Sequence, residues 1–84
     1  VFVNMEHSYM GDLELSIVCP NGTSVILNPY PNNGGGTFIG EAIDDGSIDP
    51  GIGWDYSWSS TSTNGTWNDN VPTTGPSLPA GEYE

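Results

Sequence analysis

The chain has 84 residues, and its eleven acidic residues are balanced by no lysine or arginine, so the formal net charge is −11 at pH 7. A chain without cationic side chains cannot neutralise phosphates, which argues against nucleic acid and anionic membranes as direct partners. The length allows one small domain. Glycine, proline, asparagine, serine and threonine punctuate every window of helical length, so the composition favours an all-β fold.

The N-terminal third predicts three strands. Val1, Val3 and Met5 alternate with Phe2 and Asn4, which indicates that the chain opens inside a strand. The same period-2 pattern over Asp12–Val18 predicts a half-buried strand. The residues Pro20-Asn21-Gly22 suit a short turn closed by a glycine bulge, and the alternation resumes over Ser24–Leu27. The second and third strands therefore form a β-hairpin.

The middle and the end of the chain are expected to be mostly loop. Two prolines and three glycines interrupt residues 28–37, so no regular structure is expected there. Phe38–Gly40 is expected to be a brief strand or a buried anchor, and residues 41–50 an acidic loop. Residues 61–72 predict a polar connection, and residues 73–84 an irregular tail broken by prolines.

Aromatic residues alternate in the segment from Ile52 to Ser60. If this segment is extended, Trp54, Tyr56 and Trp58 lie on one face of the strand. These rings, with Trp67, either form the core, where aromatic side chains bury large areas, or form a platform on which sugar rings stack. The core interpretation is preferred because the remaining apolar residues make a thin interior; they are Ile39, Ile43, Ile48 and Ile52.

Taken in order, several segments resemble the P domain, the β-sandwich module that follows the catalytic domain of subtilisin-like proprotein convertases. The segments that carry the resemblance are Glu6–Tyr9, Gly11–Leu13, Pro20–Thr23, Gly34–Phe38, Gly40–Ala42, Ile52–Tyr56 and Ser77–Tyr83. A cysteine before the turn proline and a triple glycine after it are closest to the branch found in secreted and surface proteins of bacteria. The resemblance implies a jelly-roll-like antiparallel β-sandwich.

The resemblance also implies that the sandwich is incomplete at the C-terminus. P domains continue with further strands that include an Asn-Gly-x-Trp motif. The segment Asn64–Trp67 looks superficially like this motif, but Asn68–Asn70 follows where an alternating apolar strand is expected. Residues 1–84 are therefore expected to form a single domain that represents the N-terminal two-thirds of a P domain. A sandwich that ended there would leave unpaired strand edges for a partner chain to cover.

An acidic cluster is the candidate metal site. Glu41, Asp44, Asp45 and Asp49 fall within nine residues, and Asp12 is expected to lie nearby in the fold. Carboxylates packed this closely repel one another, and a calcium ion, which prefers oxygen ligands, would relieve the repulsion. The spacing does not fit an EF-hand, so the site would be irregular. P domains of secreted proteases often bind calcium; the alternative is a solvated acidic loop.

Two single residues are also candidates for special roles. Cys19 is either a small buried thiol or, as the resemblance implies, one half of a disulfide whose second cysteine this chain lacks. His7 is the only histidine, and the resemblance implies that it is a structural residue, hydrogen-bonded near a strand end. An enzyme is not expected, because so short a chain can hardly build a cleft around a catalytic pair of carboxylates.

These observations predict a non-catalytic, extracellular domain of a larger secreted or cell-surface bacterial protein. As the resemblance implies, it would assist an adjacent protease domain or serve as a spacer or adhesive unit, with neighbouring domains or another surface protein as partners. The lack of lysine and arginine leaves no site for trypsin-like proteases, which suits an exposed spacer. The alternative is a calcium-dependent carbohydrate-binding module that uses Trp54, Tyr56 and Trp58.

Overall fold

The computed structural model describes residues 1–31, 33–67 and 77–84, and its regular elements in these ranges are short strands and one 3₁₀ turn. They are β1 (Phe2–Met5), η1 (Met10–Asp12), β2 (Leu15–Val18), β3 (Ser24–Asn28), β4 (Phe38–Ile39), β5 (Trp54–Trp58), β6 (Ser77–Leu78) and β7 (Gly81–Tyr83). The predicted all-β fold class is confirmed. The segment Asn68–Asn70, which bears on the expected missing strands, lies outside the described residues.

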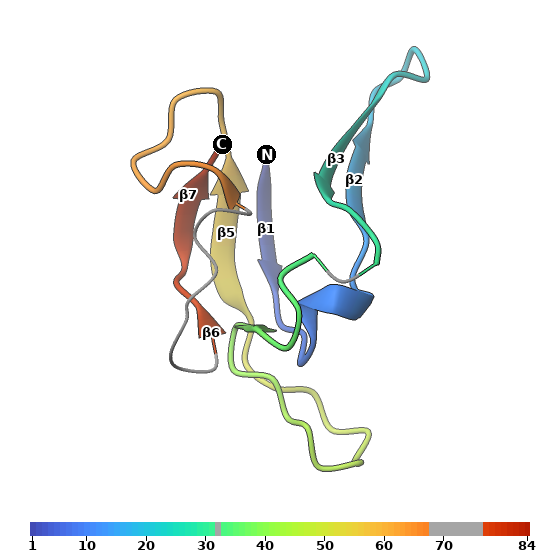
Figure 1. Ribbon diagram of the computed structural model, residues 1–84, viewed down its shortest axis with the longest axis vertical. Helices are drawn as coiled ribbons and strands as arrows, with labels where there is room; N and C mark the ends of the chain where they lie inside the picture. Colours follow the sequence, from blue (N-terminus) through green and yellow to red (C-terminus); the bar gives the residue numbers. More distant parts are fainter. Residues whose placement is uncertain (32, 68–76) are drawn as a thin grey trace.

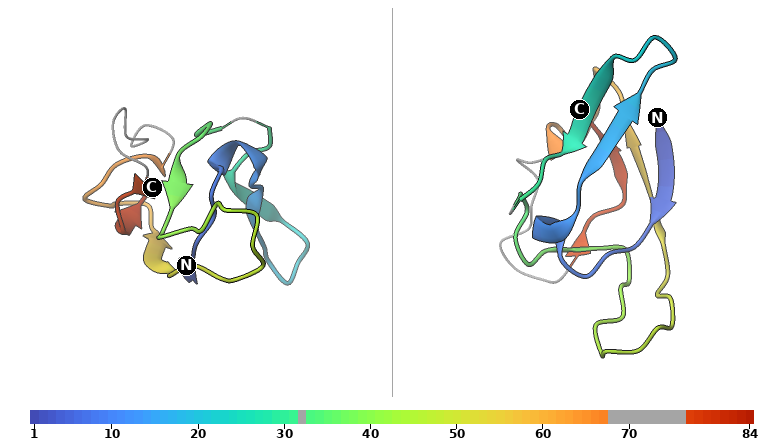
Figure 2. Two further views of the ribbon diagram at one scale, coloured as in Figure 1. Left: turned by 90° about the horizontal axis from the view of Figure 1, so that it is seen from below. Right: turned by 90° about the vertical axis from the view of Figure 1, so that its right-hand side faces the viewer.

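The strands form three small sheets in two layers. One sheet has the order β1-β5-β7, with β1 antiparallel and β7 parallel to β5. The second sheet is the antiparallel hairpin β2-β3, and the third is the parallel pair β4-β6. The hairpin stands apart from the three-stranded sheet (Figure 1) and lies in front of it when the molecule is turned (Figure 2). The arrangement is a β-sandwich, and its jelly-roll topology stays a prediction.

The predicted hairpin is confirmed, but its first strand begins later than the alternation indicated. Asp12, the first residue of the predicted strand, belongs to η1, in which the backbone N–H of Leu13 donates to the carbonyl of Met10 at 3.0 Å. The turn also buries the Met10 side chain completely against Gly34. Burying a whole methionine side chain is worth about 2 kcal/mol. The interior thus favours a turn where the local pattern favoured a strand.

The prediction of an irregular tail is wrong for the residues at its end. β6 pairs with β4, and β7 pairs with β5 through Tyr56↔Gly81, Ser57↔Glu82 and Trp58↔Tyr83. Parallel partners of this kind are joined by long crossover connections, so nothing near the tail in the sequence indicates them.

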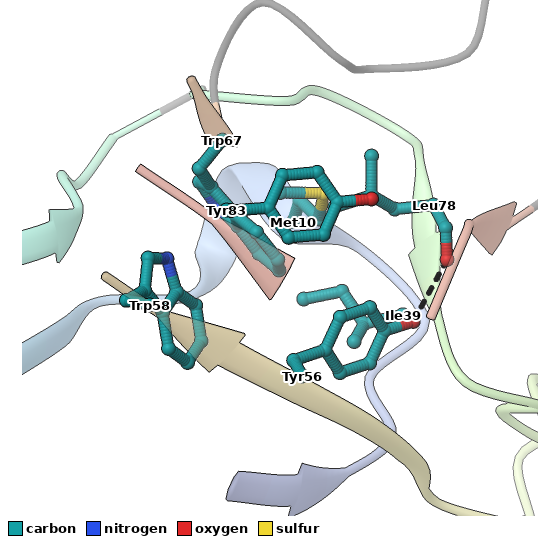
Figure 3. Packing of buried hydrophobic residues seen from close by; sticks show 7 residues of the cluster. All are labelled: Met10, Ile39, Tyr56, Trp58, Trp67, Leu78 and Tyr83. Atoms are coloured by element: carbon teal, nitrogen blue, oxygen red, sulfur yellow. Dashed lines mark hydrogen bonds between the residues drawn. The ribbon is translucent and has the colours of Figure 1, made fainter. Parts of the chain in front are cut away.

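Aromatic rings dominate the core (Figure 3). Its fully or almost fully buried members are Met10, Ile39, Tyr56, Trp58, Trp67, Leu78 and Tyr83. Trp67 lies at the centre: its ring centroid is 5.5 Å from that of Tyr56, 5.0 Å from that of Trp58 and 5.0 Å from that of Tyr83. Two of these pairs have the edge-to-face geometry that aromatic quadrupoles prefer.

Most of the isoleucines that were expected in the interior are outside it. Ile39 is completely buried, whereas Ile43, Ile48 and Ile52 are 44%, 101% and 63% exposed. Ile43 and Ile48 lie on the acidic loop, residues 41–50, which extends away from the sheets (Figure 1). The interior is thin in aliphatic residues, as the composition indicated, and aromatic rings fill it.

Candidate functional site

The hairpin forms an uncharged surface with exposed apolar side chains. Residues 15–28, here called the hairpin arm, contain no charged residue, although the whole chain carries eleven acids. Val18, Val25 and Ile26 are 67%, 52% and 60% exposed, so the arm presents apolar side chains to solvent. Within the described ranges its two strands pair only with each other. An exposed apolar surface with open strand edges is a common feature of protein interaction sites.

The tip of the arm is a tight turn with an exposed thiol. The N–H of Cys19 donates to the carbonyl of Thr23 at 2.7 Å, and the N–H of Gly22 donates to the carbonyl of Cys19 at 2.9 Å. Gly22 has φ +88°, a conformation that glycine adopts without strain. Cys19 is exposed, so the buried-thiol interpretation is wrong; its disulfide with a later cysteine stays a prediction.

A buried asparagine fixes the base of the arm. Asn28 is completely buried, and its Nδ2 donates to the carbonyls of Met10 at 3.2 Å and Leu13 at 2.7 Å. Its Oδ1 accepts from Nδ2 of Asn33 at 2.8 Å and from Nε1 of Trp67 at 3.0 Å. A buried amide with all its hydrogen bonds formed joins β3 to η1, to the loop and to the core. Sequence reasoning missed this residue, which was assigned to a loop.

Four of the predicted metal ligands lie along the acidic loop, and the fifth lies in η1. Glu41 begins the loop: its backbone pairs with Ile52, and its Oε2 accepts from Nε1 of Trp54 at 3.0 Å. Asp45 accepts from the N–H of Ser47 at 2.9 Å. The hydrogen bond from the backbone N–H of Ser47 lowers the pKa of the Asp45 carboxyl below its usual range, and the hydroxyl of Ser47 contributes a smaller effect in the same direction.

The other three predicted ligands are also exposed, and they do not complete a site. Asp44 and Asp49 lie on the acidic loop, and Asp12 lies in η1. Among the described residues no three acidic, histidine or cysteine side chains are grouped closely enough to hold a metal ion. Calcium needs six to eight oxygen ligands, so these residues as arranged do not fit it. Calcium binding therefore stays a prediction of the sequence.

The three alternating aromatic residues share one face of β5, as predicted. Tyr56 and Trp58 are buried in the core, and Trp54 is half-buried. The hydroxyl of Tyr56 accepts from the N–H of Gly40 at 2.8 Å and donates to the carbonyl of Leu78 at 2.8 Å. Burial raises the pKa of this hydroxyl. The rings of Tyr56 and Trp58 therefore present no face on which a sugar could stack in this structure.

His7 has the structural role expected of it. Its backbone N–H donates to the carbonyl of Ile39 at 2.9 Å, and the N–H of Ile39 donates back at the same distance. Its ring Nδ1 accepts from the N–H of Tyr9 at 3.1 Å. The residue thus ties the segment after β1 to β4.

Fold and surface together define a small acidic β-sandwich with an uncharged hairpin that exposes apolar side chains. The chain matches the family model of the proprotein convertase P-domain over residues 1–80. Because this match covers nearly the whole chain, the chain belongs to the P-domain family, whose members are accessory domains associated with subtilisin-like proteases. Comparisons with curated proteins and with solved structures found no match. No helix in the described part of the chain is long and apolar enough to cross a membrane.

Proposed function

We propose that this P domain is a non-catalytic accessory domain of a larger extracellular polypeptide and that it packs against a neighbouring protease domain and stabilises it. Family membership supports the association with a protease. The absence of lysine and arginine supports the extracellular setting, because trypsin-like proteases find no cleavage site in the domain.

The observation that carries the proposal is the hairpin arm. Val18 and Ile26 lie on one face of the arm, because Ile26 pairs with Ser16 and Ser24 pairs with Val18. A partner on this face would remove both exposed side chains from water, at a gain of about 25 cal/mol per Å² of apolar surface. No charged side chain of the arm would have to be desolvated, which removes the main cost of burying a surface. The acidic surface elsewhere would attract a partner whose contact rim carries lysine or arginine.

The test compares variants of the polypeptide that carries this domain. The double variant Val18→Ser and Ile26→Ser is expected to lower the unfolding midpoint of the neighbouring protease domain, because the apolar contact of this face is lost. Phe2→Ser is the matched control, since Phe2 is as exposed as Val18, at 67%, but belongs to the three-stranded sheet. Equal midpoints of the protease domain in the double variant and the wild type would reject the hairpin arm as the contact.

Two finer roles have less support. A carbohydrate-binding module would need exposed rings, and of the three candidates only Trp54 is not in the core. A spacer or adhesive role is consistent with the resistance to trypsin-like proteases, but it does not account for an apolar arm on the surface. The accessory role does.

A further inference from the structure

Asparagine followed by glycine is a reactive pair. The backbone nitrogen of the glycine can attack the carboxamide carbon of the asparagine, and glycine has no side chain to block the approach. The sequence holds three such pairs: Asn21-Gly22, Asn33-Gly34 and Asn64-Gly65. The structure places them in three different environments, and these environments predict different reactivities.

Asn21 and Gly22 lie exposed at the tip of the hairpin arm, at the far end from the core. The Oδ1 of Asn21 accepts from the N–H of Thr23 at 3.0 Å, which curls the side chain back along the Gly22 peptide. That N–H also stabilises the negative charge that develops on Oδ1 when the carboxamide carbon is attacked. No heavy atom outside the adjoining residues lies within 4 Å of the Cβ position on Gly22, so the turn has room to rearrange.

One hydrogen bond must open before the attack can occur. The N–H of Gly22 donates to the carbonyl of Cys19 at 2.9 Å. This bond closes an exposed turn that, among residues 1–31, 33–67 and 77–84, is held by the two strands of the arm. Such turns open locally at a small fraction of the free energy of global unfolding. The bond slows the reaction but does not prevent it.

The pair Asn33-Gly34 is held in place by the interior. The Nδ2 of Asn33 donates to the Oδ1 of buried Asn28 at 2.8 Å. A Cβ on Gly34 would lie 2.7 Å from the Cβ of Met10, which shows how tightly this glycine is packed. The carbonyl of Gly34 also accepts from the N–H of Thr37 at 3.1 Å.

The pair Asn64-Gly65 is held by the C-terminal end of the chain. The carbonyl of Gly65 accepts from the N–H of Glu84 at 2.8 Å and from the hydroxyl of Ser62 at 3.1 Å. The side-chain amide of Asn64 packs directly against Gly81 in β7. A ring closure at this pair would require the contact with β7 to break.

We propose that Asn21 is a site of spontaneous deamidation that the fold leaves open while it protects Asn33 and Asn64. The nitrogen of Gly22 forms a bond to Cγ of Asn21 and loses its proton, and the C–N bond of the carboxamide breaks with release of ammonia. Water then opens the resulting succinimide to aspartate or isoaspartate. The product carries one more negative charge, on an arm that otherwise carries none. If the arm docks as proposed above, this charge weakens the contact; the chemistry itself does not depend on docking.

The experiment incubates the folded 84-residue chain at mildly alkaline pH and follows each asparagine by peptide mapping. A protease that cuts after glutamate is used, because the chain has no tryptic site, and tandem mass spectrometry then distinguishes residue 21 from residue 33, which share the fragment 15–41. The acid form is expected to accumulate at residue 21 at least about tenfold faster than at residues 33 and 64, a difference of about 1.4 kcal/mol in barrier. In denaturant the three rates are expected to converge. Asn21→Gln is expected to abolish the fast phase and leave the two slow ones unchanged.

Two results would overturn the proposal. One is equal rates at the three positions in the folded chain, or a faster rate at residue 33 or 64. The other is an unmodified Asn21 in the folded chain after the denatured chain has fully reacted. Neither measurement involves a protease domain, so failure of the docking proposal would leave this result intact.

Discussion

Tyr83 shows how burial acts on a single ionisable group. Its ring is 1% exposed and packs edge-to-face on Trp67, and its hydroxyl donates to the carbonyl of Pro79 at 2.6 Å. Burial, together with the charge of Tyr56, raises the pKa of Tyr83 to about 12 from an ordinary value of 10.0. The folded state therefore stabilises the neutral phenol relative to the phenolate.

This shift predicts a loss of stability in alkali. Between pH 10 and about 12 the unfolded chain gives up the phenolic proton while the folded chain keeps it, so the free energy of unfolding falls as the pH rises. Below pH 10 both states are protonated and the group contributes no pH dependence. Urea unfolding across this pH range measures the effect. Tyr83→Phe is expected to flatten part of the decline, and an undiminished decline in that variant would contradict the assignment.

Asn28 predicts a second effect at the residue scale. Asn28→Asp replaces the donating Nδ2 by an oxygen that faces the carbonyls of Met10 and Leu13. Each buried polar group left without its hydrogen bond costs about 1–3 kcal/mol, so the domain is expected to lose at least about 2 kcal/mol.

The matched control for that variant is Asn21→Asp, at the exposed turn of the same hairpin. Its oxygen still accepts from the N–H of Thr23, so the stability is expected to change by less than about 0.5 kcal/mol. Chemical denaturation of both variants compares the same change in charge at a buried and an exposed position. Equal losses would show that charge, and not the hydrogen bonds of Asn28, determines the result.

At the scale of elements, the sequence predicted those structures that are formed by residues close together along the chain. The hairpin was predictable because alternation and turn chemistry lie within one short segment, and the shared face of Trp54, Tyr56 and Trp58 follows from the period of a strand. β6 and β7 were not predictable, because their partners β4 and β5 lie far away in the sequence. Their pairing is visible only once the chain is folded.

In the candidate site, too, features set by neighbouring residues were predictable and features set by the folded structure were not. An uncharged run of residues could be read directly from the sequence, but its exposure could not, because alternation predicted a half-buried strand. Asn28 was missed because nothing in its neighbourhood in sequence marks it as buried. The acidic cluster is compact in sequence, yet in space Glu41 bonds to Trp54 and Asp45 bonds to Ser47. Closeness along a loop does not by itself aim carboxylates at one point.

At the scale of the whole molecule, uncompensated negative charge dominates the electrostatics. Eleven carboxylates without a lysine or arginine repel one another in the compact state more than in the expanded one. Salt screens this repulsion over a length of about 10 Å at 0.1 M. The unfolding midpoint is therefore expected to rise between low salt and moderate sodium chloride.

A test of calcium binding must be compared with the effect of sodium chloride, because any salt is expected to raise the unfolding midpoint of such a chain. The sequence-based prediction requires that calcium raise the midpoint beyond sodium chloride of equal ionic strength, in a saturable way that a chelator reverses. Asp45→Asn is expected to remove this additional rise, whereas Glu14→Gln, which removes one exposed charge outside the acidic loop, is expected to keep it. Identical midpoints in millimolar calcium and in matched sodium chloride would reject the site. The acidic loop would then be a solvated loop, in agreement with the ungrouped carboxylates of the described residues.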